Sequence, residues 1–174
     1  TRRSSDLLCL WLQSVGANCV GFSLEPPSQP NLFDITQIGE KMKSIIGDIR
    51  NFELLQRTLQ KYQPEIIIHM AAQPLVNFSY QEPLITYSTN IIGTTNLLEA
   101  ARFTDSLKAI VNVTSDKCYQ NQELSRGYHE EDTLGGYDPY SSSKACVELI
   151  TQAYSYSYFK KRGINIATAR AGNV

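Results

Sequence analysis

The segment Pro64-Glu65-Ile66-Ile67-Ile68-His69-Met70-Ala71-Ala72-Gln73 contains the strand pattern that decides the fold. Its continuous run at 66–69, introduced by a proline, is typical of a strand that is covered on both faces of a parallel sheet. The two alanines after the run let a ligand approach the backbone closely, although small residues also suit a tight strand-to-helix turn. This run therefore predicts a buried strand with a candidate binding turn at its end.

Strand-like and helix-like runs alternate on both sides of this segment. Further strands are predicted at 19–24, 45–49, 109–113 and 164–169, and helices at 52–62, 83–101 and 137–161. Helix 83–101 is expected to bury a stripe of Leu84, Tyr87, Ile91, Thr94, Leu98 and Ala101. Helix 137–161 is expected to bury Cys146, Leu149, Ile150, Ala153 and Tyr154, and Gly163 to end it. The alternation predicts an α/β fold with a doubly wound, mainly parallel sheet, whose ligands lie beyond the carboxyl ends of the strands.

Composition limits the classes of function. The 174 residues contain 16 Lys and Arg against 17 Asp and Glu, which gives a net charge of −1 and leaves no basic excess for nucleic acid or an anionic membrane. The 42% hydrophobic content excludes disorder. No apolar run approaches the ~18 residues of a spanning helix. The four cysteines are expected to be reduced and mostly buried, no cluster has metal-ligand spacing, and a cytoplasmic location is expected.

Polar groups follow the strand at 109–113. Thr114-Ser115-Asp116-Lys117 brings a hydroxyl donor, a candidate general acid and a candidate general base into one small volume. A polar turn with a local ion pair is the alternative. At the second strand, Asp48 occupies the same kind of position, either as a ligand contact or as a solvated loop acid. Asn173, after the last strand, either reaches a ligand or serves as a turn residue.

Tyr140 and Lys144 lie four residues apart at the start of a predicted helix, so they share one face. An ammonium beside a phenol stabilises the phenolate form, which makes Tyr140 a candidate base. The Y-x-x-x-K pattern alone is weak, because chance supplies many such pairs. Its position directly after the Thr114–Lys117 strand end strengthens the prediction of one shared site.

These motifs resemble the extended short-chain dehydrogenase/reductase family, and within it the CDP-glucose 4,6-dehydratases. The resemblance runs from about Leu8 to Val174 and rests on several segments, namely 11–13, 21–27, 44–50, 71–76, 90–94, 113–119, 140–144 and 169–174. It implies a Rossmann-like fold and a redox-neutral dehydration that uses NAD. The implied product of CDP-glucose is CDP-4-keto-6-deoxy-glucose, a precursor of sugars in surface polysaccharides.

The resemblance also implies roles for single residues. Tyr140 would take the proton of the sugar 4-hydroxyl, Lys144 would bind the nicotinamide ribose, and Ser115 would hydrogen-bond the 4-hydroxyl. Lys117 would remove the C5 proton and Asp116 would protonate the departing 6-hydroxyl. The implied cofactor contacts are Asp48 and Ile49 at the adenine, with Ala71, Ala72, Gln73, Asn90, Thr114, Tyr140 and Lys144 along the remainder. Asn173 is the implied substrate contact.

The pattern departs from the family at both ends. Arg2 and Ser5 fall where the second and third glycines of the phosphate-binding loop are expected, and the strand before that loop is missing. The chain stops where a substrate domain would follow. We therefore expect residues 1–174 to be a partial NAD-binding domain of a longer homodimeric enzyme, paired through helices 84–101 and 137–161. The alternatives are another nucleotide-sugar dehydratase or epimerase, or a truncated copy without NAD binding.

Overall fold

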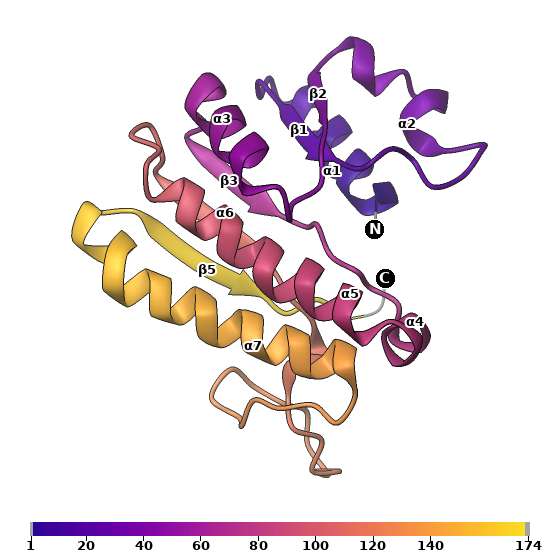
Figure 1. Ribbon diagram of the computed structural model, residues 1–174, viewed down its shortest axis with the longest axis vertical. Coiled ribbons are helices and arrows are strands. Elements are labelled where there is room, and N and C mark those ends of the chain that lie inside the picture. The colour runs from indigo at the N-terminus through magenta and orange to yellow at the C-terminus, as the bar shows by residue number, and fades with distance from the viewer. Residues whose placement is uncertain (1, 173–174) are drawn as a thin grey trace.

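The computed structural model describes residues 2–172, with side chains from Ser5 onward. Figure 1 shows an α/β arrangement in which α3, α6 and α7 cover one face of the strands. The strands are β1 (Val20–Ser23), β2 (Lys43–Ile46), β3 (Ile66–His69), β4 (Ala109–Val113) and β5 (Asn165–Ala169). The helices are α1 (Arg2–Ser14), α2 (Leu32–Ile35), α3 (Phe52–Tyr62), α4 (Val76–Gln81), α5 (Pro83–Tyr87), α6 (Gly93–Ala101) and α7 (Pro139–Tyr154). Shorter helical turns are η1 (Ile38–Glu40), η2 (Ser88–Ile92), η3 (Asp116–Cys118), η4 (Ser155–Phe159) and η5 (Lys160–Arg162).

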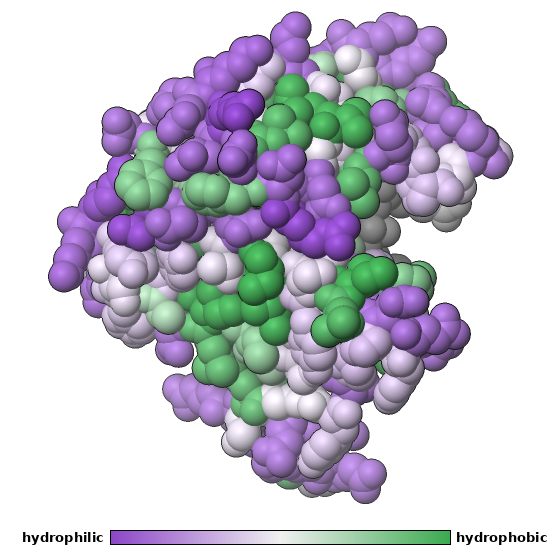
Figure 2. Space-filling model, in the orientation of Figure 1, coloured by the Kyte–Doolittle hydropathy of each residue, from purple (hydrophilic) through white to green (hydrophobic). Residues whose placement is uncertain are grey.

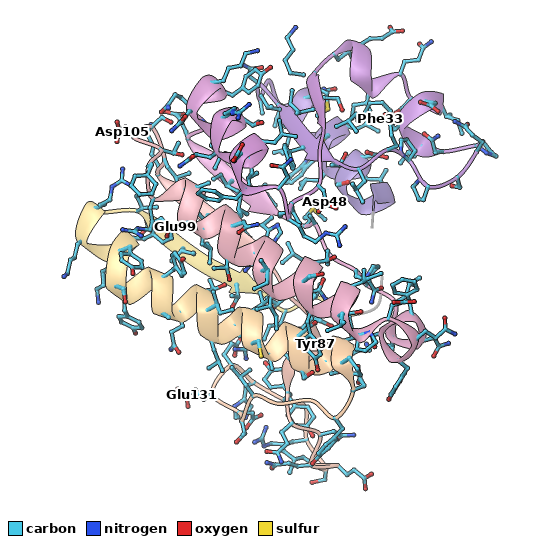
Figure 3. All side chains as sticks on the ribbon, viewed as in Figure 1. Phe33, Asp48, Tyr87, Glu99, Asp105 and Glu131 are labelled. Carbon is cyan, nitrogen blue, oxygen red and sulfur yellow. The ribbon has the colours of Figure 1, made fainter. Side chains whose placement is uncertain are left out.

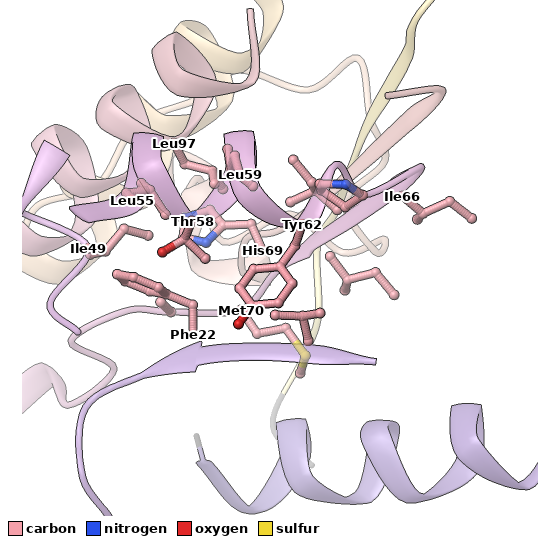
Figure 4. A pocket seen from close by; sticks show the side chains of 15 residues that line it. Phe22, Ile49, Leu55, Thr58, Leu59, Tyr62, Ile66, His69, Met70 and Leu97 are labelled. Atoms are coloured by element: carbon pink, nitrogen blue, oxygen red, sulfur yellow. The ribbon is translucent and has the colours of Figure 1, made fainter. Parts of the chain in front are cut away.

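The strands are parallel, as predicted, but they form two sheets instead of one. β1 pairs with β2, and β4 lies between β3 and β5. Within residues 2–172 no strand bridges β1 and β3, which instead line a cavity of about 170 Å³ (Figure 4). Ile66 is 60% exposed and Ile68 is also exposed, so the expectation that β3 is covered on both faces is wrong. Both side chains line the cavity instead of packing under a further layer.

The core lies between β3, β4 and the helices α3 and α6. It contains Leu55, Leu59, Ile67, Leu97, Leu98, Ile110 and Phe159, with Ile49 from the loop after β2. The 3-4-3 spacing of apolar residues in the predicted helix 52–62 is confirmed by α3, which is capped by the Asn51 side chain accepting from the Leu54 amide at 3.1 Å. α3 and α6 therefore pack together over the β3–β4 pair, as expected of parallel strands joined by helices.

Several element boundaries differ from the prediction. β2 ends at Ile46, so Gly47 to Ile49 already belong to the loop that carries Asp48. The predicted helix 83–101 starts at Pro83 but is divided by the π-helical turn η2. Helix α1 lies in a stretch for which no helix was predicted. Gly163 ends the last helical segment with φ 69, as expected of a left-handed C-cap glycine.

Burial on two helices differs from the expected stripes. Leu84 is 82% exposed and Leu149 is 55% exposed, and Ala153 is exposed too. Ile150 and Tyr154 do pack against the core, but the sheet-facing side of α7 is largely polar. Its buried members are Tyr140, Ser141, Ser143, Lys144, Ala145, Val147, Glu148 and Thr151. Figure 2 shows the resulting apolar surface over the outward side of this helical layer.

The cysteines also differ from expectation. All four are free thiols, but only Cys118 is buried, whereas the other three are partly exposed. In the described part of the chain no helix is long and apolar enough to cross a membrane. Residues 2–172 contain no group of three or more His, Cys, Asp or Glu side chains placed to hold a metal ion.

Candidate active site

The loop after β4 brings Ser115, Asp116 and Lys117 together. Ser115 caps the turn η3, because its Oγ accepts from the Lys117 amide at 3.2 Å. The same hydroxyl donates to Asp116 Oδ1 at 3.1 Å, and Lys117 Nζ donates to that oxygen at 3.3 Å. The predicted hydroxyl, acid and base are therefore within hydrogen-bond reach of one carboxylate oxygen.

The start of α7 places Tyr140 and Lys144 on the buried side of the helix. Asp138 caps the helix by accepting from the Ser141 amide at 2.9 Å, and Pro139 occupies the first turn. Lys144 is 6% exposed, and its Nζ donates to the Val113 carbonyl at 3.3 Å. That carbonyl is the last of β4, so the lysine ties α7 to the strand whose end carries Ser115.

Burial sets the charge state of Lys144. Desolvation of the ammonium lowers the pKa of Lys144 to about 8, although Glu148 one turn further along α7 acts to raise it. His69 at the end of β3 is fully buried, and burial together with the nearby Lys144 charge lowers its pKa to about 3. Its ring therefore stays neutral at pH 7 and hydrogen-bonds Thr94 at 2.9 Å.

Asp48 and Ile49 lie directly after β2. Arg50 forms a two-pronged ion pair with Asp48, and the hydrogen bonds from that guanidinium lower the pKa of Asp48. Figure 3 labels Asp48 at the edge of the β1–β2 unit. Ile49 is buried, and its carbonyl accepts from Asn96 Nδ2 at 3.2 Å. A fixed carboxylate and an apolar side chain thus lie side by side at this strand end.

The loop after β3 contains Ala71 and Ala72 with partly open surfaces, followed by a buried Gln73. Asn90 from η2 clamps Gln73, since its Oδ1 accepts from the Gln73 amide at 2.8 Å and its Nδ2 donates to the Gln73 carbonyl at 3.1 Å. Asn90 Nδ2 also donates to Ser143 Oγ on α7 at 2.8 Å. In this structure the Asn90 side chain fixes the loop to α7, and a contact with a cofactor stays a prediction.

The predicted site residues line two different cavities. Ile49 and Ala71 line the cavity of about 170 Å³ between β1 and β3. Asp116 and Lys117 line a cleft of about 990 Å³ at the ends of β4 and β5. Thr114 is buried and bonded to α7. Asn173 lies outside the described residues.

The cleft also contains residues that the sequence did not single out. Tyr119 and Tyr128 stack with ring centroids 5.1 Å apart, and both line the cleft together with Arg170. Arg170 pairs with the buried Glu148 at 2.9 Å. One sequence signal could have identified Glu148, since an acidic residue four positions after Lys144 shares its helix face.

Comparison with known proteins places these features in context. Residues 11–172 match the model of the family described as GDP-mannose 4,6 dehydratase. The chain is 49% identical to a CDP-glucose 4,6-dehydratase of Salmonella typhimurium over 96% of its own length and 48% of that enzyme. It is 28% identical to a dTDP-glucose 4,6-dehydratase of Xanthomonas campestris, covering 95% of this chain and 53% of that one.

Solved structures share the fold at lower identity. A UDP-glucose 4-epimerase from Thermotoga maritima superposes with a TM-score of 0.82 at 19% identity, over 95% of this chain and 50% of that one. A dTDP-glucose 4,6-dehydratase double mutant from Streptomyces venezuelae, solved with NAD, gives a TM-score of 0.78 at 24% identity, over 94% of this chain and 51% of the other. The chain thus spans about half the length of these relatives. From the match over residues 11–172 and the 49% identity, we conclude that the chain belongs to the GDP-mannose 4,6 dehydratase family, within the extended short-chain dehydrogenases/reductases.

Proposed function

We propose that this chain is the NAD-binding part of a longer enzyme that dehydrates CDP-glucose to CDP-4-keto-6-deoxy-glucose. The observation that carries the proposal is the meeting of two groups at the end of β4. Ser115, Asp116 and Lys117 share hydrogen bonds there, and Lys144, on the Tyr140 face of α7, is tied to the same strand. The 49% identity to a CDP-glucose 4,6-dehydratase favours this substrate over other nucleotide sugars.

The donor set fits NAD. The Asp48 carboxylate next to the apolar Ile49 suits a ribose hydroxyl and an adenine ring, and Ala71 and Ala72 leave room for close approach to the backbone after β3. Lys144 and Tyr140 suit the nicotinamide ribose at the end of β4. When bound there, NAD would supply a hydride acceptor that later gives the hydride back to the substrate.

The residues at the end of β4 supply the proton transfers. Tyr140 accepts the proton of the sugar 4-hydroxyl, with Lys144 stabilising the phenolate and Ser115 holding the hydroxyl. Lys117 would remove the C5 proton, which a ketone at C4 makes acidic. Asp116 donates its proton to the departing 6-hydroxyl, which leaves as water.

Lys117 and Asp116 have the geometry for these paired steps. The proposed roles need a neutral Lys117 amine and a neutral Asp116 acid, which differ from the ion pair by the position of one proton. Lys117 Nζ and Asp116 Oδ1 are 3.3 Å apart. Both side chains therefore reach the same point of the cleft, and the half-exposed position of the pair allows proton exchange with water.

Substitution of Tyr140 tests the proposal in the complete protein. Wild type is expected to convert CDP-glucose to a 4-keto sugar, detected by its absorbance in alkali, in preference to dTDP-glucose, UDP-glucose and GDP-mannose. Tyr140→Phe should lose at least a hundredfold in rate, within the range of general acid–base catalysis of about 10²–10⁴. Tyr80→Phe, at an exposed position of α4 away from both cavities, is the control. Full activity of Tyr140→Phe would remove Tyr140 from the mechanism.

A second candidate is a copy that binds no NAD. It is favoured by the division of the strands into two sheets, because the edges of β1 and β3 lack a partner strand among the described residues. Isothermal calorimetry with NAD on the 174-residue chain and on the complete protein separates the two. Micromolar binding by the complete protein alone supports the partial-domain proposal, whereas absence of binding by both supports the inactive copy.

We also propose a homodimer formed by the outward faces of α5 and α7 and the turns that follow them. Leu84, Ile92, Leu149 and Tyr156 are exposed there, and large apolar side chains that gather on an exposed face favour an interface. Leu149→Lys should shift the complete protein from dimer to monomer in analytical ultracentrifugation, while Leu124→Lys should not. We further propose a cytoplasmic location and, because of the proposed product, a role in polysaccharide biosynthesis.

A further inference from the structure

Glu148 is a buried carboxylate that the proposed reaction does not use. It lies on α7 and is 6% exposed. One of its oxygens accepts a short hydrogen bond from Thr114, and the other accepts from Thr168 Oγ1 and from Arg170 Nη2, each at 2.9 Å. Three donors from two neighbouring strand ends thus converge on one side chain of the helix.

These donors belong to the loops that carry the candidate chemistry. Thr114 directly precedes Ser115, and its amide donates to the Ala169 carbonyl at 2.9 Å. The Asp116 amide donates to the Ala171 carbonyl at 3.0 Å, so the ends of β4 and β5 are held together beyond the sheet itself. Glu148 fixes this joined pair of loops to α7.

Arg170 extends the connection to the wall of the cleft. Its guanidinium lies 4.8 Å from the centre of the Tyr119 ring, and Nη1 donates to the Tyr119 hydroxyl at 2.9 Å and to the Glu130 carbonyl at 3.1 Å. Tyr119 in turn stacks on Tyr128. One arginine therefore links the buried carboxylate to the segment that encloses the 990 Å³ cleft.

Stability alone does not account for this pair. Burying an ion pair costs desolvation that the Coulomb attraction repays only in part, and apolar residues of similar volume are often as stabilising. Glu148 lies one turn from Lys144 and two turns from Tyr140, so it shares the face on which both project. The negative charge of the Glu148 carboxylate also acts to raise the pKa of the buried Lys144.

We propose, on the basis of the proposed function, that Glu148 and Arg170 are positioning residues for this site. Glu148 supplies the counter-charge to Lys144 and aligns Thr114–Lys117 with the Tyr140 face of α7, and Arg170 holds Glu148 and the cleft wall in register. Neither side chain contacts the reacting atoms. Their removal therefore reduces turnover while substrate affinity is largely kept.

The test uses the complete protein and the variants Glu148→Gln and Arg170→Lys. Glu148→Gln keeps the shape but removes the charge, so kcat should fall at least tenfold with KM within about threefold, and the alkaline limb of the kcat–pH profile should move down by about one unit. Arg170→Lys keeps the charge but loses the fork and the ring contact. It should lower kcat without moving that limb.

Glu99→Gln is the matched control, because Glu99 is also a helical carboxylate bonded to an arginine and a tyrosine (Figure 3). It should leave kcat and the pH profile unchanged. If Glu148→Gln folds and keeps both the wild-type kcat and the wild-type pH profile, the proposal is overturned. If Glu148→Gln does not fold, a wild-type kcat in Arg170→Lys overturns it.

A readout without turnover separates this proposal from the proposed function. The reaction of Lys144 with acetic anhydride, followed by mass spectrometry across pH, reports its ionisation even if the wild-type protein does not act on CDP-glucose. In Glu148→Gln the labelling midpoint should fall by about one pH unit relative to wild type and to Glu99→Gln. An unchanged midpoint would refute the counter-charge role, whereas an inactive wild type would refute only the proposed reaction.

Discussion

Replacing Lys144 by methionine should stabilise the protein at pH 7 while abolishing the proposed activity. Burial lowers the pKa of Lys144 from 10.5 to about 8, and each pKa unit corresponds to about 1.4 kcal/mol. At pH 7 the folded state therefore bears a cost of about 3 kcal/mol for holding the ammonium. Lys144→Met removes that cost and loses one hydrogen bond to Val113, worth about 1 kcal/mol. The net gain is about 2 kcal/mol.

The sign can be checked by changing the pH. Between pH 8 and 10.5 the unfolded chain still binds the proton that folded Lys144 has lost, so wild-type stability rises through this window. Lys144→Met lacks that rise, and its advantage should disappear near pH 10.5.

Urea denaturation of the complete protein at pH 7, 9 and 10.5 measures both effects, with Lys161→Met at an exposed position as the control. A variant that is less stable than wild type at pH 7, or whose advantage persists at pH 10.5, would refute the reasoning.

Three further substitutions probe single contacts by urea denaturation. Burial lowers the pKa of His69 to about 3, so the free energy of unfolding of the wild type should fall by about 1.4 kcal/mol per pH unit between pH 6.5 and 3. His69→Gln should flatten that slope, and an unchanged slope would contradict the role of His69. A Cβ on Gly93 would lie 2.5 Å from Ile49 Cγ2, so Gly93→Ala should cost about 1–3 kcal/mol, whereas Gly127→Ala meets no neighbour; equal costs contradict the clash. Asp138→Ala should cost about 1 kcal/mol through loss of the α7 cap while Asp138→Asn retains it, and equal losses would exclude a capping effect.

Much of the fold follows from local sequence patterns. The apolar run at 66–69, the 3-4-3 spacing in 52–62 and Gly163 each predicted an element or its end that the structure contains. The division of the strands into two sheets did not follow, because strand pairing depends on which segments are available to lie between β1 and β3. An apolar run such as 66–69 predicts that its strand is buried, but it does not predict which strands pair with it.

Part of the candidate site could likewise be predicted from the sequence, and part could not. Ser115, Asp116 and Lys117 are adjacent in sequence, so their grouping could be predicted from one strand end. The helix with Tyr140 and Lys144 follows that strand end in the sequence, so a shared site could be predicted, whereas the contact of Lys144 with the Val113 carbonyl is known only from the structure. The Glu148–Arg170 pair joins residues 22 positions apart on a helix and a strand end, which no spacing rule connects.

The polar residues buried on α7 link the site to the proposed assembly. A helix usually buries its apolar stripe, but here Tyr140, Lys144 and Glu148 face the sheet because the candidate chemistry lies at the strand ends. Those polar side chains contribute little net stability once desolvation is counted. Val147 is buried, but Leu149 of α7 lies on the outward face and is 55% exposed, and burying such a side chain is worth about 1.5–3 kcal/mol. The placement of a polar site on the inner face thus creates the apolar outer face, which is the physical reason to expect a second subunit there.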